Sequence, residues 1–351
     1  MDAHARARRR GARGAARVAA RPLAVAYGMT TTASVLALGE LLIDFVASER
    51  GNGLGDVTTF VRAPGGAPAN VAVGVARLGV RSGFIGKVGD DPFGHHLADV
   101  LRTEGVDVSQ LRFDDGARTA LAFVSLSESG ERDFMFYRHP SADMRHRPDE
   151  LDAAAIAAAE VLHIGSISTI SEPAASATRR AVELAHAGGA LVSYDPNLRL
   201  PLWPSAEAAA RGIRALWGDA DIIKVSDEEL RFLTGRDDRE AARELWTPRL
   251  RLLLVTRGEQ GVSYLLPDAE GDVPGFTVEV ADTTGAGDAF TAAVLAALVR
   301  RPSVLEETRP LEAALRFANG YAALTTTRRG AIPAMPSRAR VEAFLAERGS
   351  A

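Results

Sequence analysis

Asp282-Thr283-Thr284-Gly285-Ala286-Gly287-Asp288-Ala289-Phe290 joins two glycines and a carboxylate to the start of a helix. The preceding run, Phe276–Val280, alternates apolar and polar residues, which predicts a strand. The following run, Ala289–Val299, is rich in Ala, Leu and Val, which predicts an amphipathic helix. A strand, a glycine turn and a helix in this order indicate one unit of an α/β fold.

Gly285, Ala286 and Gly287 predict an anion-binding turn. Glycine lets the backbone turn sharply, so that free N–H groups point outward at the positive end of the helix dipole. Asp288 follows in the first helical turn, where a carboxylate beside a phosphate site suits a general base that accepts a proton from an attacking hydroxyl. Two other interpretations stay open from this segment alone. One is a dinucleotide loop, although Phe290 stands where that fingerprint has Gly or Ala, and the other is a helix-start charge at Asp288.

Composition limits the class of protein. The chain has 351 residues, of which 46% are hydrophobic, and this suits one large α/β domain with a substantial core. The absence of cysteine excludes disulfides, a thiolate nucleophile and Cys-based zinc sites. No apolar run reaches the ~20 residues that span a bilayer, so we expect a cytoplasmic protein without a membrane partner.

The N-terminal segment differs from the rest of the chain. Residues 1–28 hold seven arginines and one acid, so the remainder carries 34 basic and 44 acidic residues. We interpret residues 1–33 as a disordered extension or a mis-assigned start with Met29 as the first residue, and residues 34–351 as the folded domain. The acidic character of that domain argues against nucleic acid as a partner.

Strand-like and helix-like segments alternate from Ser34 onward. This alternation predicts a three-layer α/β fold with a mostly parallel central sheet and ligand sites at the carboxyl ends of its strands. The expected strands are Val35–Gly39, Gly83–Val88, Val161–Gly165, Ala190–Tyr194, Asp221–Val225 and Leu252–Thr256. The expected helices are Ala69–Leu78, Phe93–Thr103, Glu172–Ala187, Ser205–Leu216 and Glu228–Leu233.

Two segments break this alternation because their strands pair without a helix between them. They are Leu41–Val46 with Val57–Arg62, and Thr119–Leu126 with Asp133–Arg138, the second pair joined at Ser127–Gly130. We interpret residues 41–62 and 113–138 as a small β-sheet lid that excludes water from a site. A surface hairpin or a homodimer contact through the lid is the alternative.

A second motif, nearer the N-terminus, adds evidence for a family resemblance. It runs Gly65-Gly66-Ala67-Pro68-Ala69-Asn70 and continues as Gly86-Lys87-Val88-Gly89-Asp90-Asp91-Pro92-Phe93-Gly94. Together with residues 282–290, it resembles the PfkB-type carbohydrate kinases of the ribokinase-like superfamily, over essentially residues 35–336. Residues 135–144, 193–205 and 224–230 resemble fructokinases in particular. The resemblance implies the ribokinase-like three-layer fold, with residues 34–351 as the kinase domain.

The resemblance also implies a sugar site. A Gly-Gly pair lets the backbone approach a polyol closely, and amide, carboxylate and guanidinium groups bind its oxygens. On chemistry alone, Asn70 fits a helix cap and Asp44 a strand charge equally well. The residues that match the family's substrate positions are Asp44, Gly65, Gly66, Asn70, Arg138 and Arg199.

For the nucleotide, the resemblance places ATP along a strand end that turns through glycines. The sequence has no Gly-x-x-x-x-Gly-Lys-Ser/Thr, so the phosphates fall to the amides of Gly285–Gly287. The matching nucleotide positions are Ser226, Thr256, Gly258, Gly261 and Asn319.

Metal ions complete what the resemblance implies. Mg²⁺ arrives with ATP and keeps several waters, one of which Glu229 holds. Ser226 stands where the family more often has Asn. A monovalent-cation loop matches Asp282, Thr284, Thr325, Arg328 and Gly330, with activation by K⁺ as an open question.

The expected activity is ATP-dependent phosphorylation of fructose to fructose 6-phosphate, with Asp288 as the base. A 2-keto-3-deoxygluconate kinase or another sugar or nucleoside kinase is the alternative on the same fold. A non-catalytic sugar-binding protein belongs to a different class, and the intact Asp288 and glycines argue against it.

Overall fold

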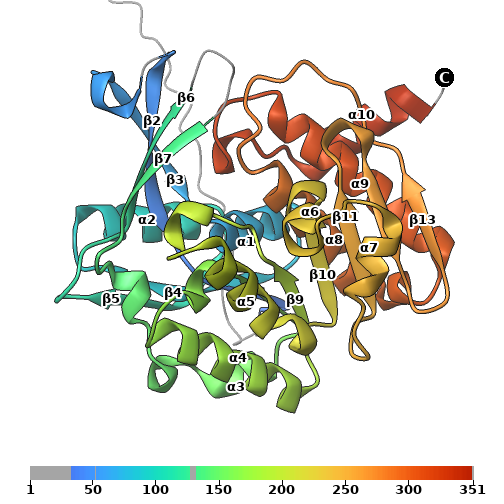
Figure 1. The fold of residues 1–351 in the computed structure, drawn as a ribbon, viewed down its shortest axis with the longest axis horizontal. Helices are drawn as coiled ribbons and strands as arrows, with labels where there is room; N and C mark the ends of the chain where they lie inside the picture. Colours follow the sequence, from blue (N-terminus) through green and yellow to red (C-terminus); the bar gives the residue numbers. More distant parts are fainter. Residues whose placement is uncertain (1–32, 52, 127–131, 350–351) are drawn as a thin grey trace, which may run out of the picture. The chain divides into compact units, whose positions relative to one another are not determined.

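Nine strands form the large sheet of the computed structural model, which describes residues 33–51, 53–126 and 132–349 (Figure 1). The predicted extension and the connection at Ser127–Gly130 lie outside these ranges, apart from Ala33. Neighbouring strands are parallel from β5 to β11, and β12 and β13 are antiparallel. The order is β13 (Glu270–Val273), β12 (Val262–Leu265), β11 (Leu252–Thr256), β10 (Ile222–Ser226), β9 (Leu191–Asp195), β8 (Val161–Gly165), β1 (Val35–Leu38), β4 (Ser82–Gly89) and β5 (Asp107–Asp114).

Helices cover both faces of this sheet. Because successive side chains of a strand point to opposite faces, Val35 and Ala37 pack on one side and Leu36 and Leu38 on the other. The first side holds α1 (Ala67–Arg77), α2 (Pro92–Thr103), α8 (Ala286–Arg300), α9 (Thr308–Thr326) and α10 (Arg338–Gly349). The second holds α3 (Ala153–Ala157), α4 (Ala174–Gly188), α5 (Ala206–Ala215), α6 (Asp227–Thr234) and α7 (Arg239–Glu244). The predicted three-layer α/β fold is therefore confirmed.

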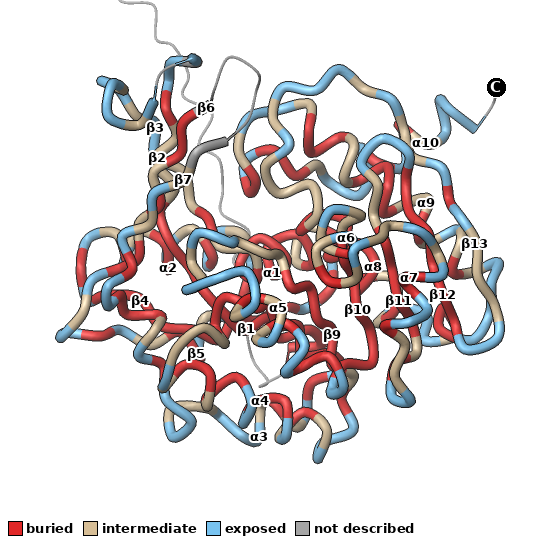
Figure 2. Tube along the Cα trace, in the orientation of Figure 1, coloured by how far each residue is buried: buried red, intermediate tan, exposed pale blue. Residues whose placement is uncertain are grey.

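Burial explains why the central strands read as continuous apolar runs. Every residue of β1, β4 and β8 is buried, as expected for parallel strands covered on both faces. Figure 2 shows this as a buried centre surrounded by exposed connections. The bounds predicted for the six strands of the central sheet agree with the observed ones to within one residue at each end.

A second, four-stranded sheet stands beside the large one. Its order is β3 (Phe60–Gly65), β2 (Leu42–Arg50), β6 (Leu121–Leu126) and β7 (Arg132–Tyr137), with β2 and β6 parallel and both outer pairs antiparallel. Both predicted strand pairs are present, but three of the four predicted lid strands differ from the observed β2, β3 and β6 by more than one residue at an end. The predicted lower bound of 113 for the second lid segment is wrong, because Phe113 and Asp114 pair with β4 in the large sheet.

Two local predictions around residues 276–299 are also wrong. Residues 276–280 form no strand, and the alternation arises because Phe276, Val278 and Val280 line a cavity. Helix α8 is buried almost all round rather than amphipathic, since it lies between α1 and α9. Among the described residues, none of the helices combines the length and apolarity needed to cross a membrane.

Candidate active site

Two cavities meet at the first turn of α8. The first lies between the four-stranded sheet and the carboxyl ends of the parallel strands, and charged side chains line it. The second lies between the loop after β13 and α9, and its lining is mainly apolar. Thr283 and Gly287 line both cavities, so groups bound in each can meet across the start of α8.

The turn before α8 depends on its glycines. Gly285 is the N-cap, with a left-handed φ of 77°, and a Cβ added there would lie 2.5 Å from the Cβ of Ala331. No side chain caps the helix, and the Ala286 N–H donates to the Thr283 carbonyl at 3.3 Å. The first N–H groups of a helix have no partner within it, so those of Gly287 and Asp288 are the donors best placed for an anion.

Asp288 lies in the first turn of α8, at the wall of the first cavity, and is only 7% exposed. Asn70 Nδ2 donates to its Oδ2 at 2.8 Å, and Asn197 Nδ2 donates to its Oδ1 at 3.3 Å. Burial raises the pKa of Asp288 to about 6, with the Asn70 hydrogen bond opposing this shift. A carboxylate of this pKa accepts a proton readily near neutral pH.

Lys224 brings a buried positive charge to the same wall. It lies in β10, and its Nζ donates to Asp195 Oδ2 at 3.0 Å. Thr291 of α8 donates to the same oxygen at 3.3 Å. A Cβ added to Gly287 would lie 3.0 Å from Lys224 Nζ, which places the ammonium against the start of α8.

Most of the residues predicted to bind the sugar lie together in the structure. Asp44, Gly66, Asn70 and Arg199 line the first cavity. Gly65 lies directly behind it, because a Cβ there would come within 2.1 Å of Asp44 Oδ2. The N-cap of α1 is Gly66, so the interpretation of Asn70 as the cap is wrong, and its side chain is available to hold Asp288.

Arg138 is not among the residues that line the first cavity, although its charge acts on Glu40, which does line it. Arg138 is 4% exposed, and its guanidinium donates twice to Asp143 Oδ2, from Nε at 3.1 Å and from a terminal nitrogen. Ser141 Oγ donates to the other oxygen of that carboxylate at 2.5 Å. The guanidinium therefore forms a buried ion pair just after β7, and its contact with a substrate stays a prediction.

Four of the five residues predicted to bind the nucleotide lie together, and Ser226 does not. Thr256, Gly258, Gly261 and Asn319 line the second cavity. The Asn319 amide donates to the carbonyls of Val273 and Pro274 at 3.0 Å each, so its side chain fixes the end of β13. Ser226 instead caps α6.

Glu229 completes that cap, which is a capping box. Ser226 Oγ accepts from the Glu229 N–H at 3.1 Å, and Glu229 Oε2 accepts from the Ser226 N–H at 2.8 Å. Glu229 Oε1 accepts from the Leu198 N–H at 2.7 Å, which holds the loop that carries Asn197 and Arg199. Glu229, which was predicted to hold a magnesium-bound water, thus also caps α6 and fixes the loop after β9, and the sequence did not predict this structural role.

Asp282 ties together the two loops of the predicted cation site. Its Oδ1 accepts from the Thr284 N–H and hydroxyl at 2.9 and 2.7 Å, and its Oδ2 accepts from the Gly330 N–H at 2.9 Å. The Thr325 hydroxyl donates to the Tyr321 carbonyl inside α9, and Arg328 is exposed. Within the described ranges, no cluster of three or more His, Asp or Glu residues could hold a metal ion by itself.

Sequence reasoning missed two charged residues that line the first cavity, Lys224 and Glu40, and a third, Asp195, that pairs with Lys224. Lys224 interrupts the apolar run of β10, Asp195 ends β9, and Glu40 follows β1. Glu40 is buried, its Oε1 accepts from the Ala67 N–H at 2.9 Å, and burial raises its pKa to about 7. Lys224 and Asp195 lie on strands that end at the site and Glu40 lies shortly after one, which is the signal that could have found them.

The comparisons with known proteins agree with this geometry. The family model "pfkB family carbohydrate kinase" matches residues 32–338. Probable fructokinase-2 of Arabidopsis thaliana is 56% identical over 313 residues, 89% of this chain and 95% of the relative. The crystal structure of a fructokinase with bound ATP from Xylella fastidiosa has a TM-score of 0.83 and 37% identity, and the match covers 90% of this chain and 98% of that one.

A second solved structure carries both kinds of ligand. It is a fructokinase from Vibrio cholerae O395 in a form with fructose, ADP and calcium ion bound, with a TM-score of 0.79 and 36% identity. The match covers 90% of this chain and 99% of that one. On the family match and these relatives, this chain belongs to the pfkB family of carbohydrate kinases.

Proposed function

We propose that this chain is an ATP-dependent fructokinase that converts fructose to fructose 6-phosphate. The observation that carries the proposal is the buried Asp288 at the junction of a cavity lined by charged side chains and a mainly apolar one. The charged groups of the first cavity suit the hydroxyls of a sugar, and the apolar cavity suits the adenine end of a nucleotide. The fructokinase names of the relatives agree with this assignment.

In this proposal Asp288 is the general base. Its carboxylate accepts the proton of the 6-hydroxyl as that oxygen attacks the γ-phosphorus of ATP, and the bond to the β,γ-bridging oxygen breaks to release ADP. The N–H groups at the start of α8 stabilise the charge of the transferred phosphoryl group. Asn70 and Asn197 hold the carboxylate in place through the hydrogen bonds at 2.8 and 3.3 Å.

Mg²⁺ accompanies ATP in this scheme and neutralises the phosphate oxygens. It needs few protein ligands because it binds through phosphates and waters. Glu229 fits the part of a water holder, since each of its oxygens accepts a single backbone bond and keeps a lone pair. For K⁺, Asp282 and the adjacent loop carbonyls are the proposed site, tested by exchanging K⁺ for Na⁺ in the assay.

The charge of the sugar cavity favours fructose over 2-keto-3-deoxygluconate. Asp143 neutralises Arg138, which leaves Arg199 and Lys224 as the cations of the lining and Glu40, Asp44 and two further aspartates as its acids. A carboxylated substrate would meet repulsion there. We therefore expect kcat/KM for fructose to exceed that for the keto-acid.

A coupled ADP-release assay over a panel of sugars tests the proposal. The wild-type chain should turn over fructose, and Asp288→Asn should keep fructose binding while kcat falls ~10²–10⁴-fold, the range for a lost general base. An Asp288→Asn variant with near-normal kcat would show that Asp288 is not the general base. A higher kcat/KM for the keto-acid than for fructose would refute fructose as the preferred substrate, but it would not contradict the assignment of Asp288 as the base.

The four-stranded sheet is the proposed lid, and its outer face is the proposed homodimer contact. Phe45, Phe60 and Tyr137 surround Phe123, with ring centroids 5.0 to 5.4 Å apart, and Tyr137 remains 58% exposed. An exposed ring such as Tyr137, backed by half-buried aromatic rings, suits an interface with a second copy. Light scattering on the wild type and on Tyr137→Asp tests it, with the variant expected to be monomeric.

A further inference from the structure

The geometry points to Lys224 as a second catalytic residue, the cation that neutralises the phosphoryl group during transfer. This inference rests on the proposed kinase reaction and adds a residue to it. Lys224 lines the sugar cavity beside Gly287, which together with Thr283 lines both cavities. Its ammonium therefore stands where the transferred group must pass.

The charges around the junction require such a cation. Asp288 lies at the start of α8, Asp195 at the end of β9 contacts Thr291 of the same helix and acts on Asp288, and a phosphoryl group brings further negative charge to this place. The Gly287 and Asp288 N–H groups supply only partial positive charge. Lys224 is 8% exposed, so its full charge acts with little screening by water.

Lys224 is held by residues that leave part of its donor capacity available. An ammonium has three N–H donors, and one of them goes to Asp195 Oδ2 at 3.0 Å. Burial lowers the pKa of Lys224, but Asp195 and then Glu229 outweigh that effect and raise it above its ordinary value. The side chain is thus protonated throughout the working range. Asp195 and Thr291 are its positioning residues.

The transfer step balances with Lys224 in this role. The O–P bond from the sugar oxygen to the γ-phosphorus forms, the bond from that phosphorus to the β,γ-bridging oxygen breaks, and the hydroxyl proton goes to Asp288. Lys224 transfers no proton. It donates a hydrogen bond to an oxygen of the phosphoryl group, where a charged donor is worth more than a neutral one.

The competing explanation is that Lys224 only compensates Asp195 within the core. Removing one member of a buried pair leaves an uncompensated charge. A loss of activity in Lys224→Met alone could therefore come either from lower stability or from the loss of a catalytic group. The double variant Lys224→Met/Asp195→Asn removes both charges and separates the two roles. A purely structural lysine predicts that the double variant regains both stability and kcat.

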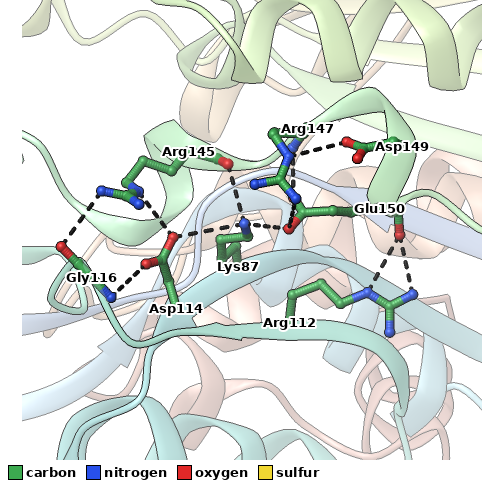
Figure 3. Close-up of polar contacts among 8 residues, drawn as sticks. All are labelled: Lys87, Arg112, Asp114, Gly116, Arg145, Arg147, Asp149 and Glu150. Carbon is green, nitrogen blue, oxygen red and sulfur yellow. Dashed lines mark hydrogen bonds and ion pairs between the residues drawn. The ribbon is translucent and has the colours of Figure 1, made fainter.

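Lys87 provides the matched control, because it is also a buried lysine on a parallel strand. It is 4% exposed, and Figure 3 shows it between Asp114 and Glu150, with Nζ 2.5 Å from Glu150 Oε1 and 3.2 Å from the Arg145 carbonyl. None of these described residues lines either cavity. Lys87→Met should lower the melting temperature and leave kcat per folded enzyme unchanged.

The experiment measures melting temperature, kcat and KM for wild type, Lys224→Met, the double variant and Lys87→Met, on the best sugar of the panel. We expect Lys224→Met to lose ~10²–10³-fold in kcat, as for a lost oxyanion donor, with KM for the sugar within a few fold. The double variant should regain melting temperature while kcat stays low. Recovery of kcat in the double variant would overturn the inference. If instead the wild type phosphorylates no sugar, it is the proposed function that fails.

Discussion

Asp288→Asn should make the protein more stable at neutral pH while it removes activity. Burial raises the pKa of Asp288 from 3.8 to about 6, so the folded state holds a carboxylate that would prefer to be protonated. A group with a raised pKa contributes stability that is present below its unfolded pKa and lost as pH rises through its folded pKa. Above pH 6 the ionised Asp288 therefore destabilises the fold, and asparagine does not.

The magnitude follows from the shift. About two pKa units correspond to about 3 kcal/mol at 1.36 kcal/mol per unit. The full difference is present at pH 8, falls to about half at pH 5, and vanishes below pH 4. The Asn70 hydrogen bond survives the change, because an asparagine oxygen can accept it. Glu40, whose pKa is raised to about 7, is common to both proteins and cancels.

Urea unfolding of both proteins at pH 8 and pH 5 measures this. The Asp288→Asn variant should unfold at higher urea than the wild type, with the larger difference at pH 8. Asn319→Asp supplies the opposite exchange at another buried position, and it should lower stability at pH 8. An Asp288→Asn variant equal to or less stable than wild type at pH 8 would refute the claim that burial destabilises the ionised Asp288.

Three further predictions concern the turn and the lid. Gly285→Ala should destabilise the fold, because a Cβ would lie 2.5 Å from Ala331 at a φ of 77°, and thermal melting checks it. Gly287→Ala should fold normally but lower kcat, since its Cβ would lie 3.0 Å from the flexible end of Lys224. Fructose should protect the amides of β2 and β6 from hydrogen exchange more than those of α4, and equal protection would contradict lid closure.

Sequence patterns predicted the layers well because parallel strands and their covering helices have strong periodic signals. β8 and β11 have the bounds that were predicted for them. The run Phe276–Val280 was misleading because alternation reports only that alternate side chains share a face, and these side chains line a cavity without any strand partner. Hydrogen bonding between strands is a property of tertiary structure that a single segment does not encode.

The candidate site was predictable where function depends on backbone, and less so where it depends on charge pairing. Gly285, Gly287 and Asp288 are close in sequence, so their geometry follows from local turn and helix physics. The partner of Arg138 is five residues away, at Asp143, yet nothing in an isolated arginine says whether it binds a substrate or a neighbour. Only the folded positions of both side chains decide between these roles.

The hydrogen bond from Asn70 to Asp288 depends on how closely α1 approaches α8. Gly74 follows Asn70 by one helical turn, and Ala292 follows Asp288 by one turn. A Cβ on Gly74 would lie 2.6 Å from the Cβ of Ala292, so only glycine permits this approach. The small side chains of Gly74 and Ala292 therefore allow the 2.8 Å hydrogen bond between Asn70 Nδ2 and Asp288 Oδ2.

Gly74→Ala should consequently separate the two helices near the site. Overpacking of this kind costs about 1–3 kcal/mol, and it should also lengthen the Asn70 contact, so kcat falls while KM for ATP changes little. Gly218→Ala is the matched control, because nothing lies within 4 Å of a Cβ there. If Gly74→Ala loses stability and keeps full kcat, then the base is positioned without α1, and Asn197 alone must hold it.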